Sequence, residues 1–214
     1  DVTLEAFKLF WANPSYGVEG QKGITSFFHW GDADFFLLDN RYFRAPNFRE
    51  STERTMLGEE QLEWLIDALV SSRSTWKFVA IGGQVLTTAA VYENYIRLYP
   101  EEREYIIKRI EEEEILNVIF LTGDRHHTEL NRLELPTGNV IYDLTVSPLT
   151  AGYPDSPNET SENMVEGTET YDRNFGIIEI TGPRKARELK IQVFNTEGEE
   201  QWNYRLEAQY WKRK

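Results

Sequence analysis

The hydrophobic positions in the first part of the chain alternate between two kinds of spacing. Apolar residues recur at helical spacing over three segments, residues 4–12, 55–72 and 101–114. Short apolar runs typical of strands occupy residues 24–30, 34–39, 76–81 and 115–120. A tight turn at residues 31–33 joins the first two of these as a hairpin. This alternation of strands and helices predicts an α/β arrangement with a mixed sheet and two main helices.

After residue 128 the pattern changes to short strands separated by turn residues. They are predicted at residues 129–133, 140–146, 175–181, 188–194 and 201–206. This spacing is typical of an antiparallel meander. The polar segment from Thr150 to Arg173 is predicted to be a long loop, and loops of that length are often functional. Without a repeat or a linker, residues 1–214 are interpreted as one α/β (α+β) unit that ends in antiparallel strands.

Composition limits the classes of partner. The chain has 23 Lys and Arg against 36 Asp and Glu, a formal net charge of −13, so no binding to nucleic acid is expected. Cysteine is absent, which excludes disulfides and thiolate metal sites. No segment approaches the roughly 18 apolar residues of a membrane-spanning helix. No signal peptide is visible, and the chain begins with Asp1 rather than Met, so we expect a piece of a longer polypeptide.

The segment from Leu121 to Leu130 holds two of the three histidines and follows an apolar run. Asp124 and His126 are two residues apart in a tight turn, where a carboxylate and an imidazole can face one cation. The alternative is that the carboxylate pins the turn and the histidines are solvated. His127 would face the other way in an extended segment, so we expect it to contact substrate or to support the ligands.

Two other strands also end in polar loops. Arg41 and Arg44 follow the strand that ends at Asp39, and their guanidinium groups could bind an oxyanion. The alternative, which we favour for Asp39, is a structural ion pair that anchors Arg41. Gln84 follows two glycines and offers a neutral oxygen, a tight turn being the alternative. His29 lies in an alternating aromatic strand and is interpreted as structural. If the strands are neighbours in one sheet, the three polar clusters converge on one edge.

The order of these motifs resembles a known family. It consists of LDNRYFR at residues 38–44, LGxxQxxWL from residue 57, WKFV at 76–79 leading to GQV at 83–85, and GDxH at 123–126. This set resembles the C-terminal half of PhoD-like alkaline phosphatases, which belong to the calcineurin-like metallophosphoesterases, over roughly residues 24–146. The resemblance implies that the chain is part of an α/β/β/α sandwich with flanking helices.

The resemblance also implies a chemistry, the hydrolysis of phosphate mono- or diesters. Two divalent or trivalent metal ions (Fe, Ca, Zn or Mn) would position and activate the attacking water. The metal ligands expected by motif are Asp124, His126 and Gln84. Asn40 and Arg41 resemble the loop around the site, and together with His127 they are the expected catalytic residues. The family further suggests an exported protein, periplasmic or extracellular, whose signal is not in this chain.

The chain departs from the family in one respect. The N-terminal half of the family carries a Gly-Asp loop and an Asp/Asn-His-Asp segment, and residues 1–14 match neither. We therefore expect an incomplete metal site, weak metal binding and little hydrolysis by this fragment alone. The alternative function is a non-catalytic accessory or binding domain that keeps the fold. A half-sandwich should expose an apolar sheet face, which the missing N-terminal half or a second copy would cover.

Overall fold

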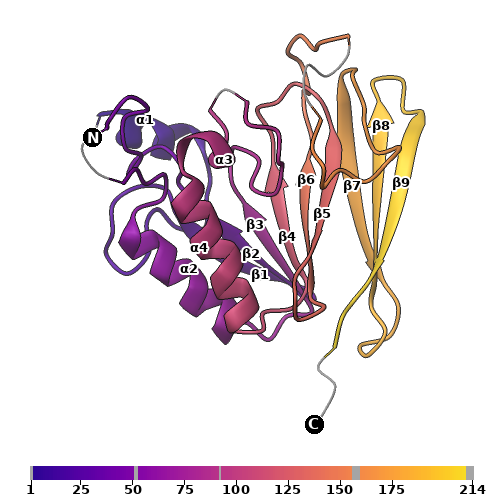
Figure 1. Ribbon diagram of the computed structural model, residues 1–214, viewed down its shortest axis with the longest axis horizontal. Helices are drawn as coiled ribbons and strands as arrows, with labels where there is room; N and C mark the ends of the chain where they lie inside the picture. Colours follow the sequence, from indigo (N-terminus) through magenta and orange to yellow (C-terminus); the bar gives the residue numbers. More distant parts are fainter. Residues whose placement is uncertain (1, 51–52, 92, 156–159, 211–214) are drawn as a thin grey trace.

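The computed structural model describes residues 2–50, 53–91, 93–155 and 160–210 (Figure 1). Its helices are α1 (Val2–Phe10), α2 (Glu59–Ser71), α3 (Tyr95–Leu98) and α4 (Pro100–Glu112). Its strands are β1 (Ser26–Trp30), β2 (Ala33–Leu37), β3 (Trp76–Ala80), β4 (Val118–Thr122), β5 (Glu129–Glu134), β6 (Val140–Thr145), β7 (Asn174–Thr181), β8 (Glu188–Asn195) and β9 (Glu200–Glu207). None of the helices in this part of the chain is long and apolar enough to cross a membrane.

The strands form two sheets. The larger is mixed and has the order β1-β2-β3-β4-β6-β5, in which β2, β3, β4 and β6 are parallel and the two edge strands are antiparallel to their neighbours. The smaller is the antiparallel sheet β7-β8-β9. The mixed α/β fold is thus confirmed, but the five-strand meander was wrong. Only its last three strands form one, because β6 pairs in parallel with β4, with Thr122 opposite Thr145.

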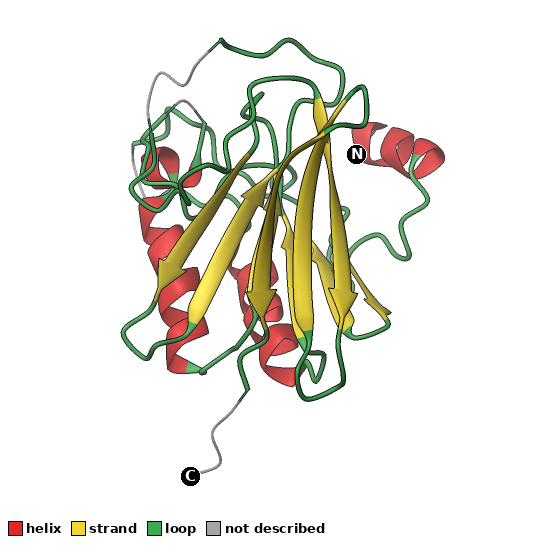
Figure 2. Ribbon diagram, turned by 90° about the vertical axis from the view of Figure 1, so that its right-hand side faces the viewer, coloured by secondary structure: helices red, strands yellow, loops and turns green. Residues whose placement is uncertain are grey.

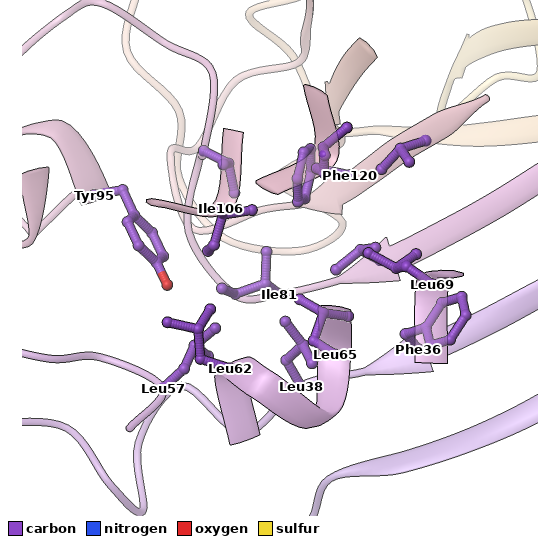
Figure 3. Close-up of a cluster of buried hydrophobic side chains, with 14 of the residues drawn as sticks. Phe36, Leu38, Leu57, Leu62, Leu65, Leu69, Ile81, Tyr95, Ile106 and Phe120 are labelled. Atoms are coloured by element: carbon purple, nitrogen blue, oxygen red, sulfur yellow. The ribbon is translucent and has the colours of Figure 1, made fainter. Parts of the chain in front are cut away.

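The large sheet lies between two layers. Helices α2 and α4 cover one face and the β7-β8-β9 sheet covers part of the other, as the two perpendicular views show (Figures 1 and 2). Neighbouring residues on each strand point to opposite faces, so Phe36 and Phe120 pack under the helices with Leu65 (Figure 3). Phe78 and Ile119 point the other way, toward the small sheet. Both faces of the central strands are therefore packed against apolar side chains. This packing holds the strands in place, and with them the loops that follow their ends.

Some element boundaries differ from those predicted. Helix α2 begins at Glu59 rather than residue 55, because the buried carboxylate of Glu102 holds the preceding backbone in a non-helical bend. Its Oε1 accepts hydrogen bonds from the backbone N–H groups of Met56 (3.1 Å) and Leu57 (3.0 Å). Strand β4 begins at Val118, since the residue before it has a φ of 59°. The single helical turn of α3 was not predicted.

The long loop before β7 is attached to the large sheet. Isolated bridges pair Thr128 with Thr170 and Asn131 with Met164, so part of the loop runs beside β5. Trp202 of β9 donates a hydrogen bond to the Thr170 hydroxyl (3.0 Å). Residues 156–159 of the predicted loop lie outside the described residues. The part of the loop that contains Met164 and Thr170 therefore lies next to β5 and the residue before it.

Large apolar side chains are exposed at the periphery of the molecule. Helix α1 buries none of its residues, and Phe10 is 83% exposed. Trp30 on the edge strand β1 is 77% exposed, and Phe175 and Ile177 on the edge strand β7 are also exposed. These positions are where we expect further protein to pack, and the identity of that partner stays a prediction.

Candidate functional site at the carboxyl ends of the parallel strands

The loops that follow β2, β3 and β4 lie side by side at one edge of the large sheet. The backbone N–H of Gly123 donates to the carbonyl of Gly82 at 3.3 Å, which joins the second and third loops. A Cβ placed on Gly82 would lie 2.7 Å from Nδ2 of Asn40, so the Asn40 side chain rests on this glycine. The predicted convergence of the three polar loops is therefore confirmed.

The loop after β4 turns sharply. Asp124 has a φ of 69° and His126 a φ of 59°, both in the left-handed region that non-glycine residues seldom adopt. The segment does not extend, and both side chains are exposed to solvent. Among the described residues neither side chain has a hydrogen-bond or ion-pair partner. The turn thus presents one carboxylate and one imidazole that are free to bind.

His127 is buried beneath this turn, with 3% of its surface exposed. Its Nε2 lies 3.2 Å from Oε2 of Glu129, and its Nδ1 lies 3.2 Å from the carbonyl oxygen of Arg125. The ring of Tyr171 packs against it with centroids 5.5 Å apart. His127 is buried whereas His126 is exposed, although the segment does not extend as that expectation assumed, and both ring nitrogens of His127 already have partners. Its position favours support of the turn over direct contact with substrate.

Gln84 is also buried, at 1% exposure. Its Nε2 donates to Oε1 of Glu129 at 2.6 Å and to Oγ1 of Thr145 at 3.0 Å. Asn131 donates a second hydrogen bond to the same carboxylate oxygen of Glu129, at 2.8 Å. Burial works to raise the pKa of Glu129, but the hydrogen bonds from His127, Asn131 and Gln84 outweigh it, and the pKa lies below its ordinary value. The strand-end loops therefore rest on a buried, ionised carboxylate.

A second carboxylate, Asp143, is fully buried next to the first. Its Oδ2 accepts the backbone N–H groups of Val85 (2.6 Å) and Leu86 (2.8 Å), and its Oδ1 accepts the hydroxyl of Thr122 (2.7 Å). Burial raises the pKa of Asp143 to about 6 despite these hydrogen bonds, and the charge of Glu129 adds to the increase. Asp143 thereby fixes the backbone just after Gln84.

Neither buried carboxylate was singled out from the sequence. Both lie in strands whose alternation gives no sign that an acidic residue faces inward. The available signal was the apolar setting of Asp143 in the run VIYDLTV, residues 140–146.

The loop after β2 is held by Asp39, which is 4% exposed. Its two oxygens accept the backbone N–H groups of Ile24 (3.0 Å), Arg41 (2.9 Å) and Tyr42 (2.8 Å). Gln61 of α2 clamps the same residue, donating to its carbonyl at 2.9 Å and accepting from its N–H at 2.8 Å. Asp39 is thus structural, as favoured above, but it anchors the Arg41 backbone and not its guanidinium group.

The two arginines of this loop differ in their surroundings. The Arg44 side chain is 9% exposed and donates hydrogen bonds to Asn47 and to the Tyr99 hydroxyl, so it is committed within the protein. The Arg41 side chain is 65% exposed, and its contact with Glu93 is long, at 3.6 Å. Of these two arginines, Arg41 is the one whose guanidinium group is accessible.

His29 lies at the opposite end of the sheet and does not join the site. Its Nδ1 is 2.7 Å from Oδ1 of Asp34, a carboxylate that also accepts a hydrogen bond from Ser72 at 2.6 Å. These contacts tie the β1-β2 hairpin to the end of α2, in keeping with a structural role. A cavity of about 900 Å³ adjoins them, far from the strand-end loops.

The described residues do not by themselves fit a metal ion. They contain no group of three or more His, Asp and Glu side chains arranged to hold one. Asp124 and His126 offer two donors, and the nitrogen of the Gln84 amide is turned toward Glu129. An ion at this edge would need further ligands from outside the residues that the structure describes.

A family model described as "PhoD-like phosphatase" matches residues 12–190. The chain belongs to the PhoD-like phosphatase family. The resemblance carried by the ordered motifs is thus confirmed.

Known proteins are similar to this PhoD-like chain in sequence or in fold. Alkaline phosphatase D of Bacillus subtilis (strain 168) is 32% identical over 121 residues, covering 48% of this chain and 21% of that protein. The solved structure titled "Structure of PhoD" has a TM-score of 0.67 at 18% identity and covers 97% of this chain and 48% of that one. Purple acid phosphatase PPD1 from yellow lupin (Lupinus luteus) seeds has a TM-score of 0.65 at 14% identity, covering 96% and 35%.

These two structures share the fold of the PhoD-like chain, and at such low identities they establish the fold alone. The chain spans half or less of the length of each relative.

Proposed function

We propose that this chain is part of a hydrolase that cleaves phosphate mono- or diesters at the edge where β2, β3 and β4 end. The proposal is carried by the convergence of the three loops, in which Asn40 rests on Gly82 and Gly82 is hydrogen-bonded to Gly123. Asp124 and His126 stand exposed on the last of these loops, so the groups available for binding gather where ligands bind in open α/β sheets.

Each residue then has a defined role. Asp124 and His126 contribute two ligands to a centre of divalent or trivalent metal ions, and Gln84 offers its amide oxygen. The exposed guanidinium group of Arg41 binds the phosphate oxygens of the substrate. His127 supports the turn from below, and Asn40 shapes the floor beside Gly82.

The remaining ligands come from residues outside this chain, which on this proposal forms one unit, the C-terminal part of an exported phosphatase domain. The isolated chain therefore binds metal weakly and hydrolyses little.

Activity assays on two proteins test this proposal. The substrates are p-nitrophenyl phosphate and its bis ester, with Mn²⁺, Zn²⁺, Ca²⁺ or Fe³⁺ added. In a longer polypeptide that contains this chain, Asp124→Ala should abolish both turnover and metal retention, while His29→Ala should leave them unchanged. Turnover by the isolated 214-residue chain at rates usual for enzymes, of the order of 1–1000 per second, would contradict the incomplete site.

A non-catalytic accessory domain is the second candidate. It is favoured by the lack, among the described residues, of any group of three acidic or histidine side chains suited to a metal. Unchanged activity of the Asp124→Ala variant in the longer polypeptide would support this candidate and exclude the first.

A further inference from the structure

We propose that Glu129 is a positioning residue that orients the side-chain amide of Gln84, so that this residue presents oxygen and not nitrogen to the site. The inference rests on the proposed function, because it deepens the role of a residue at the same edge. Glu129 is 5% exposed and touches the candidate site only through other side chains.

The hydrogen bonds of Gln84 determine which way its amide faces. A glutamine amide has two N–H donors, and both are used here, one toward Oε1 of Glu129 (2.6 Å) and one toward Oγ1 of Thr145 (3.0 Å). No described residue donates to its Oε1. The flipped amide would instead place two acceptor oxygens against each other at 2.6 Å, so the Glu129 side chain selects a single orientation.

The same carboxylate organises the floor around this amide. Its Oε1 also accepts from Asn131 (2.8 Å), and its Oε2 faces Nε2 of His127 (3.2 Å). Glu129 thereby links the loop after β3, which carries Gln84, to the turn after β4, which His127 supports. One buried carboxylate fixes both loops relative to each other.

Burial of this kind is unfavourable unless the charge is well paired, and an apolar residue at an inward-facing position would pack with less cost. The two hydrogen-bonded amides and the imidazole supply the pairing. Gln84 and His127 lie in the strand-end loops and Asn131 lies beside Glu129 on β5, which ties the arrangement to the site and not to the core between the helices and the sheet.

The test uses the 214-residue chain and the side-chain amide signals in ¹H–¹⁵N NMR spectra. In the native chain the two amide protons of Gln84 should exchange slowly with solvent. Glu129→Leu removes both acceptor oxygens, whereas glutamine would keep one oxygen that could accept from both Gln84 and Asn131, and we expect exchange to become at least tenfold faster. Thr145→Val is the matched control, which removes the weaker partner and should accelerate exchange less.

A reversed pair separates orientation from simple loss of folding. In the double variant Gln84→Glu with Glu129→Gln, the amide moves to position 129 and its donors again face a carboxylate. The unpaired Oδ1 of Asn131 becomes a further acceptor after a flip of that amide. Slow exchange of the side-chain amide at position 129 would support the proposal, and its absence in a folded double variant would contradict it, as would unchanged exchange in Glu129→Leu.

Titration with Mn²⁺ alone distinguishes this inference from the proposed function. If Asp124 and His126 bind the ion, their signals should broaden in the native chain, and Glu129→Leu should raise the dissociation constant for Mn²⁺ severalfold. Absence of broadening in the native chain would count against the metal-binding role while leaving the orientation result intact. Broadening with the same affinity in the native chain and in Glu129→Leu would overturn the positioning role.

Discussion

Replacing Asp143 by asparagine should stabilise the protein at alkaline pH and leave it unchanged at acid pH. The Asp143 carboxyl group is fully buried, and its pKa rises from the ordinary 3.8 to about 6. The folded state therefore holds the proton more tightly than the unfolded state, so the free energy of unfolding falls as the pH rises between about 4 and 6. Above that window, the difference between the two pKa values corresponds to about 3 kcal/mol.

Asparagine fits the hydrogen bonds that this side chain makes. Both backbone donors, Val85 and Leu86, point at a single oxygen of Asp143, which the amide oxygen can replace. The other oxygen accepts only from Thr122, whose hydroxyl can turn to accept from the new N–H and donate to Thr145 at 2.9 Å. Neutral asparagine should therefore recover most of the about 3 kcal/mol without leaving a buried group unpaired.

Urea unfolding at pH 4.0 and pH 8.0 measures the effect, both values lying away from the isoelectric point near 4.8. We expect Asp143→Asn to exceed the native chain by about 3 kcal/mol at pH 8.0, a rise of about 6–12 °C in Tm for a chain of this size. At pH 4.0 the two should agree within about 0.5 kcal/mol. Equal or lower stability of the variant at pH 8.0 would refute the reasoning, since the hydrogen bonds would then outweigh the burial of the charge.

Three further predictions concern two other buried carboxylates and the close contact between Gly82 and Asn40. Asp39→Asn should destabilise the chain by about 1–3 kcal/mol in urea unfolding, because both oxygens of Asp39 accept backbone N–H groups and one would face the new amide nitrogen. Glu102→Ala should cost about 2–4 kcal/mol in the same assay, since it leaves two buried backbone donors without an acceptor. Gly82→Ala should displace the Asn40 side chain and shift its amide signals in NMR spectra, whereas Gly83→Ala, which meets open space, should leave them unchanged.

The sequence was sufficient to locate most elements and the three polar loops. Period-2 and helical spacing are local signals, and the strands that carry Phe36, Val79 and Phe120 are apolar enough to stand out. The convergence of the loops also followed, because parallel strands end at a common edge. The position of β6 did not follow. Its hairpin with β5 is local, but its parallel pairing with β4 is set by contacts across the sheet that no local pattern records.

The state of the site residues was harder to predict. The exposed turn at Asp124 and His126 can be anticipated from a glycine followed by polar residues. The orientation of the Gln84 amide cannot, because it is decided by Glu129, which is 45 positions away in the chain. A charged residue in an alternating strand is normally assigned to the solvent side, and here the charge faces inward. Sequence periodicity places the backbone of this site but not the hydrogen bonds that define its chemistry.

Substitutions of the two buried carboxylates should have different effects, one on stability and the other on the candidate site. They lie on adjacent antiparallel strands, with Asn131 opposite Asp143 and Glu129 opposite Thr145, and the charge of Glu129 raises the pKa of Asp143. Asp143 binds mainly backbone, so its neutral isostere should gain stability. Glu129 binds the side chains of Gln84 and His127, so Glu129→Leu, which removes both acceptor oxygens, should lose their orientation whatever its effect on unfolding. If both substitutions stabilised the chain and the exchange of the Gln84 amide protons stayed slow, the buried Glu129 carboxylate would lower stability without serving the site. Faster exchange of these protons in Glu129→Leu would instead show that the carboxylate is retained for the orientation of Gln84.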